Sequence, residues 1–274
     1  KSEGNLLQRI YFAVSEGEPA KELLEKGPIL DPEHMLTVRG IKHYADGALG
    51  SRGAALLEKY HDYDTEGLLI FKKEEIMPVL EEALQKGIQV QTHAIGDKGN
   101  QVTLDWYQEA FNSVSNEERQ IIDPRWRIEH SQIITKEDQI RFKNMKIIAS
   151  MQPSHAIGDL HFAPDRLGME RVGDGYVWRN LIDLGVVIAG GSDAPVEIGD
   201  PRIEFYAAVA RKDLDGFYDK GWHLEQAVSR SEALKMFTIW PAFAAFQEDV
   251  KGSIEVGKLA DLTIFSEDIM TIPL

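Results

Sequence analysis

The 274-residue sequence predicts an α/β fold, a TIM-type (β/α) barrel or six-eighths of one. Two observations lead to this prediction. Short apolar segments alternate with amphipathic helical segments, which is the pattern of βα units and a parallel sheet. In addition, no G-x-G-x-x-G or Walker-type loop follows the early strands, and this absence disfavours the main alternative, a doubly wound open sheet.

Six short segments are the predicted strands of the sheet. Each one is apolar or alternates between apolar and polar residues, and each is followed by turn or helix signals. These segments are Leu7–Val14, Gly40–Asp46, Ile88–His93, Trp126–His130, Lys146–Met151 and Val186–Gly190.

Helical patterns lie between the strands. In Glu74–Lys86 the apolar residues recur at helical spacing. Pro78 suits only a first turn, so this helix is expected to begin near Glu75, and Gly87 is expected to end it. Asp97 is the expected N-cap of the next helix. The other predicted helices are Gln101–Phe111, Tyr176–Leu184, Ile203–Arg211 and Leu224–Phe237.

Two segments carry neither pattern. Gln152–Gly175 is expected to be a long loop, and loops of that length are usually lids or binding loops. After residue 250 the sequence changes to short β-like pieces around Gly257. Residues 1–250 are therefore assigned to the barrel, and residues 251–274 to a small β-structure outside the main sheet.

Composition excludes several classes of function. The formal charge is −15 with the acidic residues scattered, which argues against binding nucleic acid or anionic membranes. The absence of cysteine excludes disulfides, zinc–thiolate sites and thiol nucleophiles. No apolar run reaches the length of a membrane span. The cellular compartment is left open, with the cytoplasm as the default.

Three strand ends carry side chains that suit a metal site. His93 and His130 each end an apolar run, and Asp193 follows a third. In a parallel barrel these ends meet at one rim, where two imidazoles and a carboxylate can bind a divalent cation. Alternation along the strand predicts that Glu129 points away from the site and pairs with a residue such as Arg127.

Lys42 lies within a predicted strand and has more than one possible role. A Schiff-base lysine occurs in some barrels, whereas a barrel-interior ion pair with Asp46 is the plainer alternative. A serine nucleophile is not supported, because no G-x-S-x-G motif is present. The segment Ala189–Ser192 offers a faint phosphate-binding loop, but Asp193 would repel a phosphate there.

Six motifs in order resemble the amidohydrolase superfamily, and more narrowly its branch that contains N-substituted formamide deformylases. They are IKHYADGALGSRGA, QTHAIGD, RIEHSQ, MQPSHA, GSDAPV and KGSIEVGKLADL. The resemblance implies a hydrolase that cleaves C–N bonds of a small-molecule substrate through water activated by one or two divalent metal ions, zinc by default.

The resemblance also implies roles for individual residues. Lys42 would be a carboxylated lysine that bridges the metals, with His93 and His130 as ligands, and Asp193 would be both ligand and general base. His155 would contact the substrate or support a ligand. Asp46 and Arg52 would line the pocket, although a surface ion pair is the safer expectation for Arg52.

The sequence departs from the family at its beginning. The family's first strand ends in His-x-His, yet no two of the eight histidines here have that spacing. By the resemblance, strands one and two are expected to be absent, so that the incomplete barrel contains strands three to eight and residues 251–274 are a remnant of the family's small β-sandwich domain. A catalytically incompetent fragment or a non-catalytic module is the alternative to an enzyme. An open sheet would also leave unpaired edges, through which copies of the chain are expected to associate.

Overall fold

A computed structural model describes residues 6–218 and 220–274. The strands are β1 (Ile10–Ser15), β2 (Ile29–Leu30), β3 (Leu36–Tyr44), β4 (Gln89–Ala94), β5 (Arg127–His130), β6 (Ile148–Met151) and β7 (Ile188–Gly190). The α-helices are α1 (Glu18–Lys26), α2 (Lys73–Lys86), α3 (Asp97–Ser113), α4 (Lys136–Met145), α5 (Pro153–Asp159), α6 (Ala163–Arg171), α7 (Trp178–Leu184), α8 (Pro201–Ala210), α9 (Arg230–Met236) and α10 (Ile239–Ala244). Two short 3₁₀ helices are η1 (Val172–Asp174) and η2 (Leu224–Gln226).

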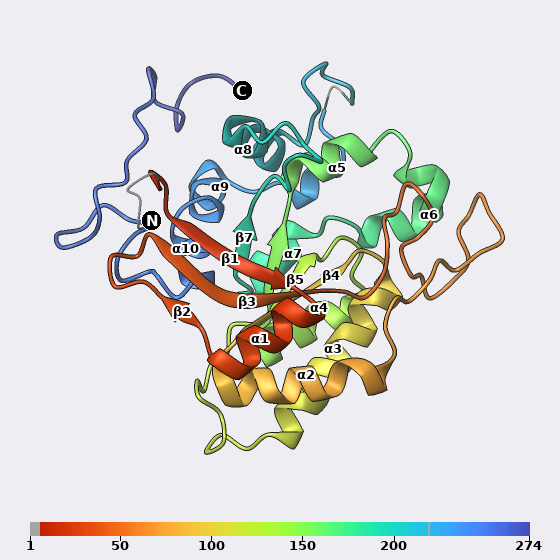
Figure 1. Cartoon of the computed structure of the whole chain (residues 1–274). Coiled ribbons are helices and arrows are strands. Elements are labelled where there is room, and N and C mark those ends of the chain that lie inside the picture. The colour runs from red at the N-terminus through yellow and green to blue at the C-terminus, as the bar shows by residue number, and fades with distance from the viewer. Residues whose placement is uncertain (1–5, 219) are drawn as a thin grey trace.

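The main strands follow one another in the sheet in chain order, β1-β3-β4-β5-β6-β7, and all pair in parallel. Only the two-residue β2 is antiparallel, at the side of β3. A doubly wound sheet would reverse its strand order at a switch point, and this sheet does not. The fold is therefore a curled half-barrel, which agrees with the predicted partial TIM-type barrel (Figure 1).

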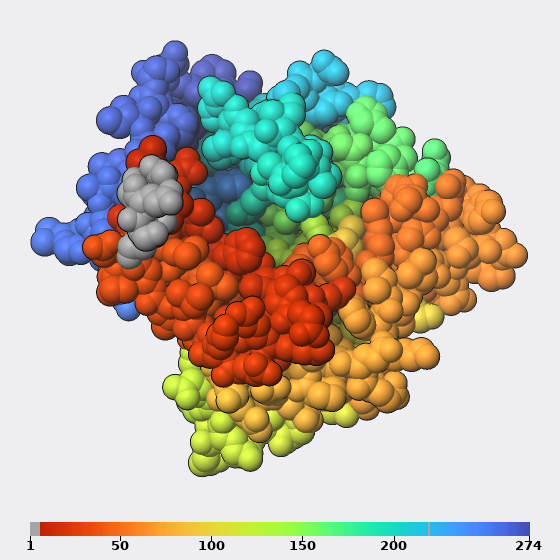
Figure 2. Space-filling model, viewed as in Figure 1, coloured from red at the N-terminus to blue at the C-terminus, as the bar shows by residue number. Residues whose placement is uncertain are grey.

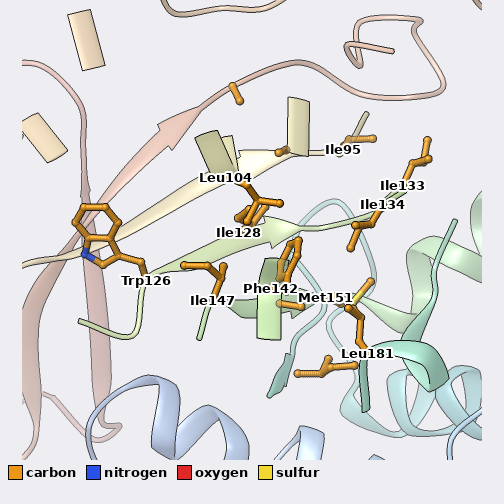
Figure 3. Packing of buried hydrophobic residues seen from close by; sticks show 14 of the residues in the cluster. Ile95, Leu104, Trp126, Ile128, Ile133, Ile134, Phe142, Ile147, Met151 and Leu181 are labelled. Atoms are coloured by element: carbon orange, nitrogen blue, oxygen red, sulfur yellow. The ribbon is translucent and has the colours of Figure 1, made fainter. Parts of the chain in front are cut away.

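Helices cover the convex face of this sheet and form the core with it. Ile128 of β5 belongs to one cluster of buried apolar residues with Leu104 of α3, Phe142 of α4 and Leu181 of α7, all of which are labelled in Figure 3. These four side chains are fully buried. Their burial drives the docking of the helices, since each large apolar side chain contributes about 1.5–3 kcal/mol.

The concave face of the sheet is polar, and the strand register shows why. Side chains at paired positions of parallel strands point to the same side. Lys42 pairs with Gln91, which pairs with Arg127, so these three form one layer. The next layer toward the carboxyl ends of the strands contains Tyr44, His93, Glu129 and Ser150. The polar layers thus lead up to the strand ends.

The C-terminal part of α10 covers the other end of the concave face. The side chains of Ile148 and Ala189 pack with Ala244 and Phe243. The side-chain Nε2 of Gln89 also donates a hydrogen bond of 2.8 Å to the Ala244 carbonyl. The half-barrel is therefore closed at the amino ends of its strands and stays accessible at their carboxyl ends.

Several predicted element boundaries were wrong. Helix α2 begins at Lys73, and Pro78 is its sixth residue. The Lys72 amide donates to the Glu75 carboxylate, which adds a capped turn before the proline. Asp97 is the first residue of α3, whose N-cap is Gly96, and its carboxylate instead accepts the Leu57 amide. The predicted helix Leu224–Phe237 is divided into η2 and α9.

The segment predicted as a long loop is mostly helical. It contains α5, α6 and η1. The helices are short, and Gly168 has a non-helical conformation inside α6, so no sustained helical periodicity shows in the sequence.

The C-terminal segment 251–274 forms neither a helix nor a strand. The predicted sandwich remnant is therefore not seen, and its assignment to a separate domain stays a prediction.

The outer edge of β1 pairs with no other strand among residues 6–218 and 220–274. Ile10 and Phe12 of that strand are exposed. Association of copies through this edge also stays a prediction. Within the same described ranges, no helix has the length and apolar character needed to cross a bilayer.

Candidate functional site

The carboxyl ends of β4 and β5 bring the predicted histidines together. The rings of His93 and His130 lie 4.5 Å apart between centroids, edge to face. Figure 2 shows a hollow in the centre of this side of the molecule, between the cyan segment near residue 200 and the red strands β1 and β3. The two histidines lie close together, as predicted from their positions at the ends of parallel strands.

His130 reaches the site through an unusual backbone conformation. Its φ is 73°, and that of the following Ser131 is 45°. Left-handed conformations are uncommon for residues other than glycine, and here they interrupt the alternation of side chains along β5. Glu129 keeps the inward position beside His93, while His130 turns in from the end of the strand.

The predicted outward orientation of Glu129 is therefore wrong, although its predicted pairing with Arg127 is found. The Arg127 Nε lies 3.2 Å from Glu129 Oε1. That carboxylate oxygen is buried and makes no hydrogen bond to any residue that the structure describes. Glu129 thus lies on the concave face near Lys42. Its charge raises the pKa of Lys42, while burial of the amine, the larger effect, lowers that pKa.

His155, on α5, adds a third imidazole to the site. Its ring stacks on His130 with a centroid distance of 5.6 Å. Its Nε2 lies 3.8 Å from Oε1 of Glu197. The structure therefore brings His155 beside the predicted ligands, whereas its contact with a substrate stays a prediction.

Burial keeps these imidazoles neutral. It lowers the pKa of His93 to about 4, helped by the nearby Lys42 ammonium. Burial likewise lowers the pKa of His130 well below its usual value, and His93 and Lys42 add to the effect. A neutral imidazole keeps a lone pair, which is the form that binds metals. Lys42 has a lowered pKa for the same main reason, burial.

Asp46 connects the ends of β3 and β4. Its buried carboxylate accepts backbone N–H groups from Ala55, Ile95 and Gly96 at 2.8–3.0 Å. Its Oδ1 also lies 3.5 Å from Nε2 of His93. Burial raises the pKa of Asp46 to about 7, while the three N–H donors oppose that rise. This geometry supports a role in holding His93, and the contribution of Asp46 to the lining of a substrate pocket stays a prediction.

Arg52 and Asp193 lie at the periphery. The Arg52 guanidinium makes two hydrogen bonds with the Asp62 carboxylate at 3.0 and 2.7 Å, which is the surface ion pair that we considered the safer expectation. Asp193 follows β7, is exposed, and has a φ of 57°. Its charge raises the pKa of both Lys42 and His155, against the lowering effect of their burial. The alternative considered for Lys42, an ion pair with Asp46, is not formed, because backbone N–H groups hold the Asp46 carboxylate.

The predicted ligands fit a metal ion only in part. Within the described ranges, no three His, Asp or Glu side chains are grouped closely enough to hold one. What the structure does provide is two neutral imidazoles in contact and the buried Lys42 amine one layer below them. Nitrogen donors of this kind suit zinc.

Sequence reasoning missed two residues that contact this group. Glu129 was overlooked because alternation was assumed to continue through His130. Gln152 was overlooked because it lies in the segment taken for a loop, yet its Oε1 is 2.9 Å from Nδ1 of His130. The only signal was its position directly after a strand end.

Comparison with known proteins places the chain in a family. A model of the amidohydrolase family matches residues 6–273, so the chain belongs to that family. Protein LONG AFTER FAR-RED 3 of Arabidopsis thaliana is 36% identical over 260 residues, which are 94% of this chain and 43% of that protein. An N-substituted formamide deformylase of Arthrobacter pascens is 29% identical over 248 residues, 88% of this chain and 43% of the enzyme.

A solved structure agrees with this assignment. An uncharacterised metal-dependent hydrolase of Pyrococcus furiosus superimposes with a TM-score of 0.82 at 32% identity, over 98% of this chain and 53% of that one. The chain thus spans about half the length of the relatives that it matches. The predicted superfamily is confirmed.

The tight packing around Asp46 generates a prediction about Gly99 of α3. A Cβ added there would lie 2.4 Å from Asp46 Oδ2, an atom that the backbone donors hold in place. Gly99→Ala should therefore lower the free energy of unfolding by about 1–3 kcal/mol, although alanine normally favours a helix. Urea unfolding measures the change.

Gly173→Ala is the matched control, because a Cβ at Gly173 meets nothing within 4 Å. It should change stability by no more than about 0.5 kcal/mol. Equal stability of Gly99→Ala and the wild type would contradict the tight packing.

Proposed function

We propose that the protein carrying this chain is a metal-dependent hydrolase of C–N bonds in amides, formamides or cyclic amides. The observation that carries the proposal is the pair of neutral imidazoles, His93 and His130, at the carboxyl end of a curled parallel sheet with the Lys42 amine beneath them. Similarity to a formamide deformylase and to a metal-dependent hydrolase supports the reaction class and the ion.

Lys42 is the proposed carboxylated residue, and its surroundings suit that modification. Burial lowers its pKa, so that more of the amine is neutral and nucleophilic. The neutral nitrogen would form a bond to the carbon of CO₂ and release one proton to water, which yields an anionic carbamate. The carbamate would replace a cationic group that repels a metal by one that attracts it.

His93 and His130 would hold the ion with this carbamate and Asp193, and zinc is the expected metal. A bound divalent ion would supply Lewis-acid activation of water and of the scissile carbonyl. Asp193 would take the proton of the attacking water and deliver it to the leaving nitrogen. His155 is the proposed substrate contact, because its ring lies beside His130 at the accessible end of the sheet.

A non-catalytic role is the second candidate, and two observations favour it. The chain has no His-x-His, and no preformed group of three His, Asp or Glu ligands exists in the described part. In that case the fold would persist while the chain alone lacks turnover.

The role of Asp193 can be tested directly. Asp193→Asn should abolish turnover of N-substituted formamides or amides, a loss of roughly 10²–10⁴-fold, because asparagine cannot accept the proton. The variant should still bind metal. Steady-state hydrolysis and metal content are measured on the same samples of the protein that carries this chain.

Asp183→Asn, a change at an exposed carboxylate paired with Arg179 on α7, is the matched control and should retain full activity. Undiminished hydrolysis by Asp193→Asn would refute the assignment of the base.

A further inference from the structure

Gln152 is placed between two strand ends by the topology of the sheet. It directly follows β6 and precedes Pro153, the first residue of α5. Since β5 and β6 pair in parallel, with Glu129 opposite Ser150, the residues that follow these two partners also come close together. Gln152 is only 7% exposed, so its amide is not free to exchange its partners for bulk water.

The Gln152 amide makes two contacts that define its orientation. Its Nε2 donates to the Ser150 carbonyl at 3.3 Å, and its Oε1 lies 2.9 Å from Nδ1 of His130. The reverse orientation would place an amide oxygen against the Ser150 carbonyl oxygen, two acceptors with no proton between them. The Oε1 atom therefore faces His130, and an oxygen acceptor there requires a proton on Nδ1.

We infer that Gln152 is a positioning residue that holds neutral His130 in the tautomer with the proton on Nδ1 and the lone pair on Nε2. No partner for Nε2 is found among the described residues, so this nitrogen stays available for a ligand. Metal-bound histidines commonly donate their second ring N–H to a fixed acceptor, which sets the ring orientation and tautomer.

His93 has its own acceptors. Its Nε2 lies 3.4 Å from the Gly47 carbonyl and 3.5 Å from Asp46 Oδ1, so its proton belongs on Nε2 and its lone pair on Nδ1. The two neighbouring rings are thus held in opposite tautomers by separate partners. Loss of Gln152 should therefore affect His130 and leave His93 unchanged.

The test is the tautomeric state of His130 in metal-free protein, read from ¹⁵N chemical shifts with two-bond ¹H–¹⁵N correlation. The His130 signals are assigned by their absence in His130→Asn. The wild type should show a protonated Nδ1 and an unprotonated Nε2. Gln152→Met, which has similar size but no acceptor, should shift the population toward a protonated Nε2.

A control variant sharpens the comparison. Gln139→Met removes a buried glutamine of α4 that hydrogen-bonds the Ile134 carbonyl, and it should leave His130 unchanged. A protonated Nε2 in the wild type, or an unchanged tautomer in Gln152→Met, would overturn the inference.

A second readout links the residue to the metal and rests on the proposed function. Zinc titration with a competing chelator should give an affinity about 10–100-fold lower in Gln152→Met than in Gln139→Met. If the tautomer changes and neither protein binds zinc, the positioning role stands and the proposed function fails. Equal zinc affinity with a changed tautomer would overturn the role of Gln152 toward the metal.

Discussion

The buried carboxylate of Asp46 is the constraint on which the site most depends. It joins the end of β3 to the chain that follows β4 through the amides of Ile95 and Gly96, and it binds the loop after β3 through Ala55. These hydrogen bonds offset only part of the cost of burying the carboxylate, because burial still raises the pKa of Asp46 to about 7. His93 lies in β4, two residues before Ile95, and its Nε2 is 3.5 Å from Asp46 Oδ1. The carboxylate beside this imidazole is therefore held in place by hydrogen bonds from the protein's own backbone.

The open half-barrel turns a polar face toward its accessible end. In a closed barrel the interior is packed with branched apolar side chains, whereas here the layers contain Lys42, Gln91, Arg127, His93 and Glu129. The helices on the convex side supply the apolar core, and α10 covers the amino ends of the strands. Stability and chemistry are thus separated, because the convex face carries the packing and the carboxyl end of the concave face carries the titratable groups.

Much of this arrangement could be predicted from the sequence, for a physical reason. Apolar strands in βα units form a parallel sheet, and parallel strands place their carboxyl ends at one edge, so His93 and His130 were expected to meet. The order of the six motifs identified the family. The left-handed backbone of His130 and Ser131 carries no signal, because neither residue is glycine, and it changed the orientation of Glu129. Helices α5 and α6 are too short for periodicity to reveal, so Gln152 was hidden in an apparent loop. The hydrogen bonds of Asp46 could not be predicted, because its N–H donors come from loops whose approach only the tertiary structure defines.

The central claim is that His93 and His130, with Lys42, form a binding site for a divalent metal. The most direct test is the metal content per chain, measured by plasma mass spectrometry on protein purified without chelators or a histidine tag. The account predicts about one zinc-like ion per chain in the wild type and in His223→Ala, a change at a histidine paired with Glu225 outside the site, and a loss of that ion in His93→Ala. A wild-type chain without metal, or equal metal content in His93→Ala, would contradict it.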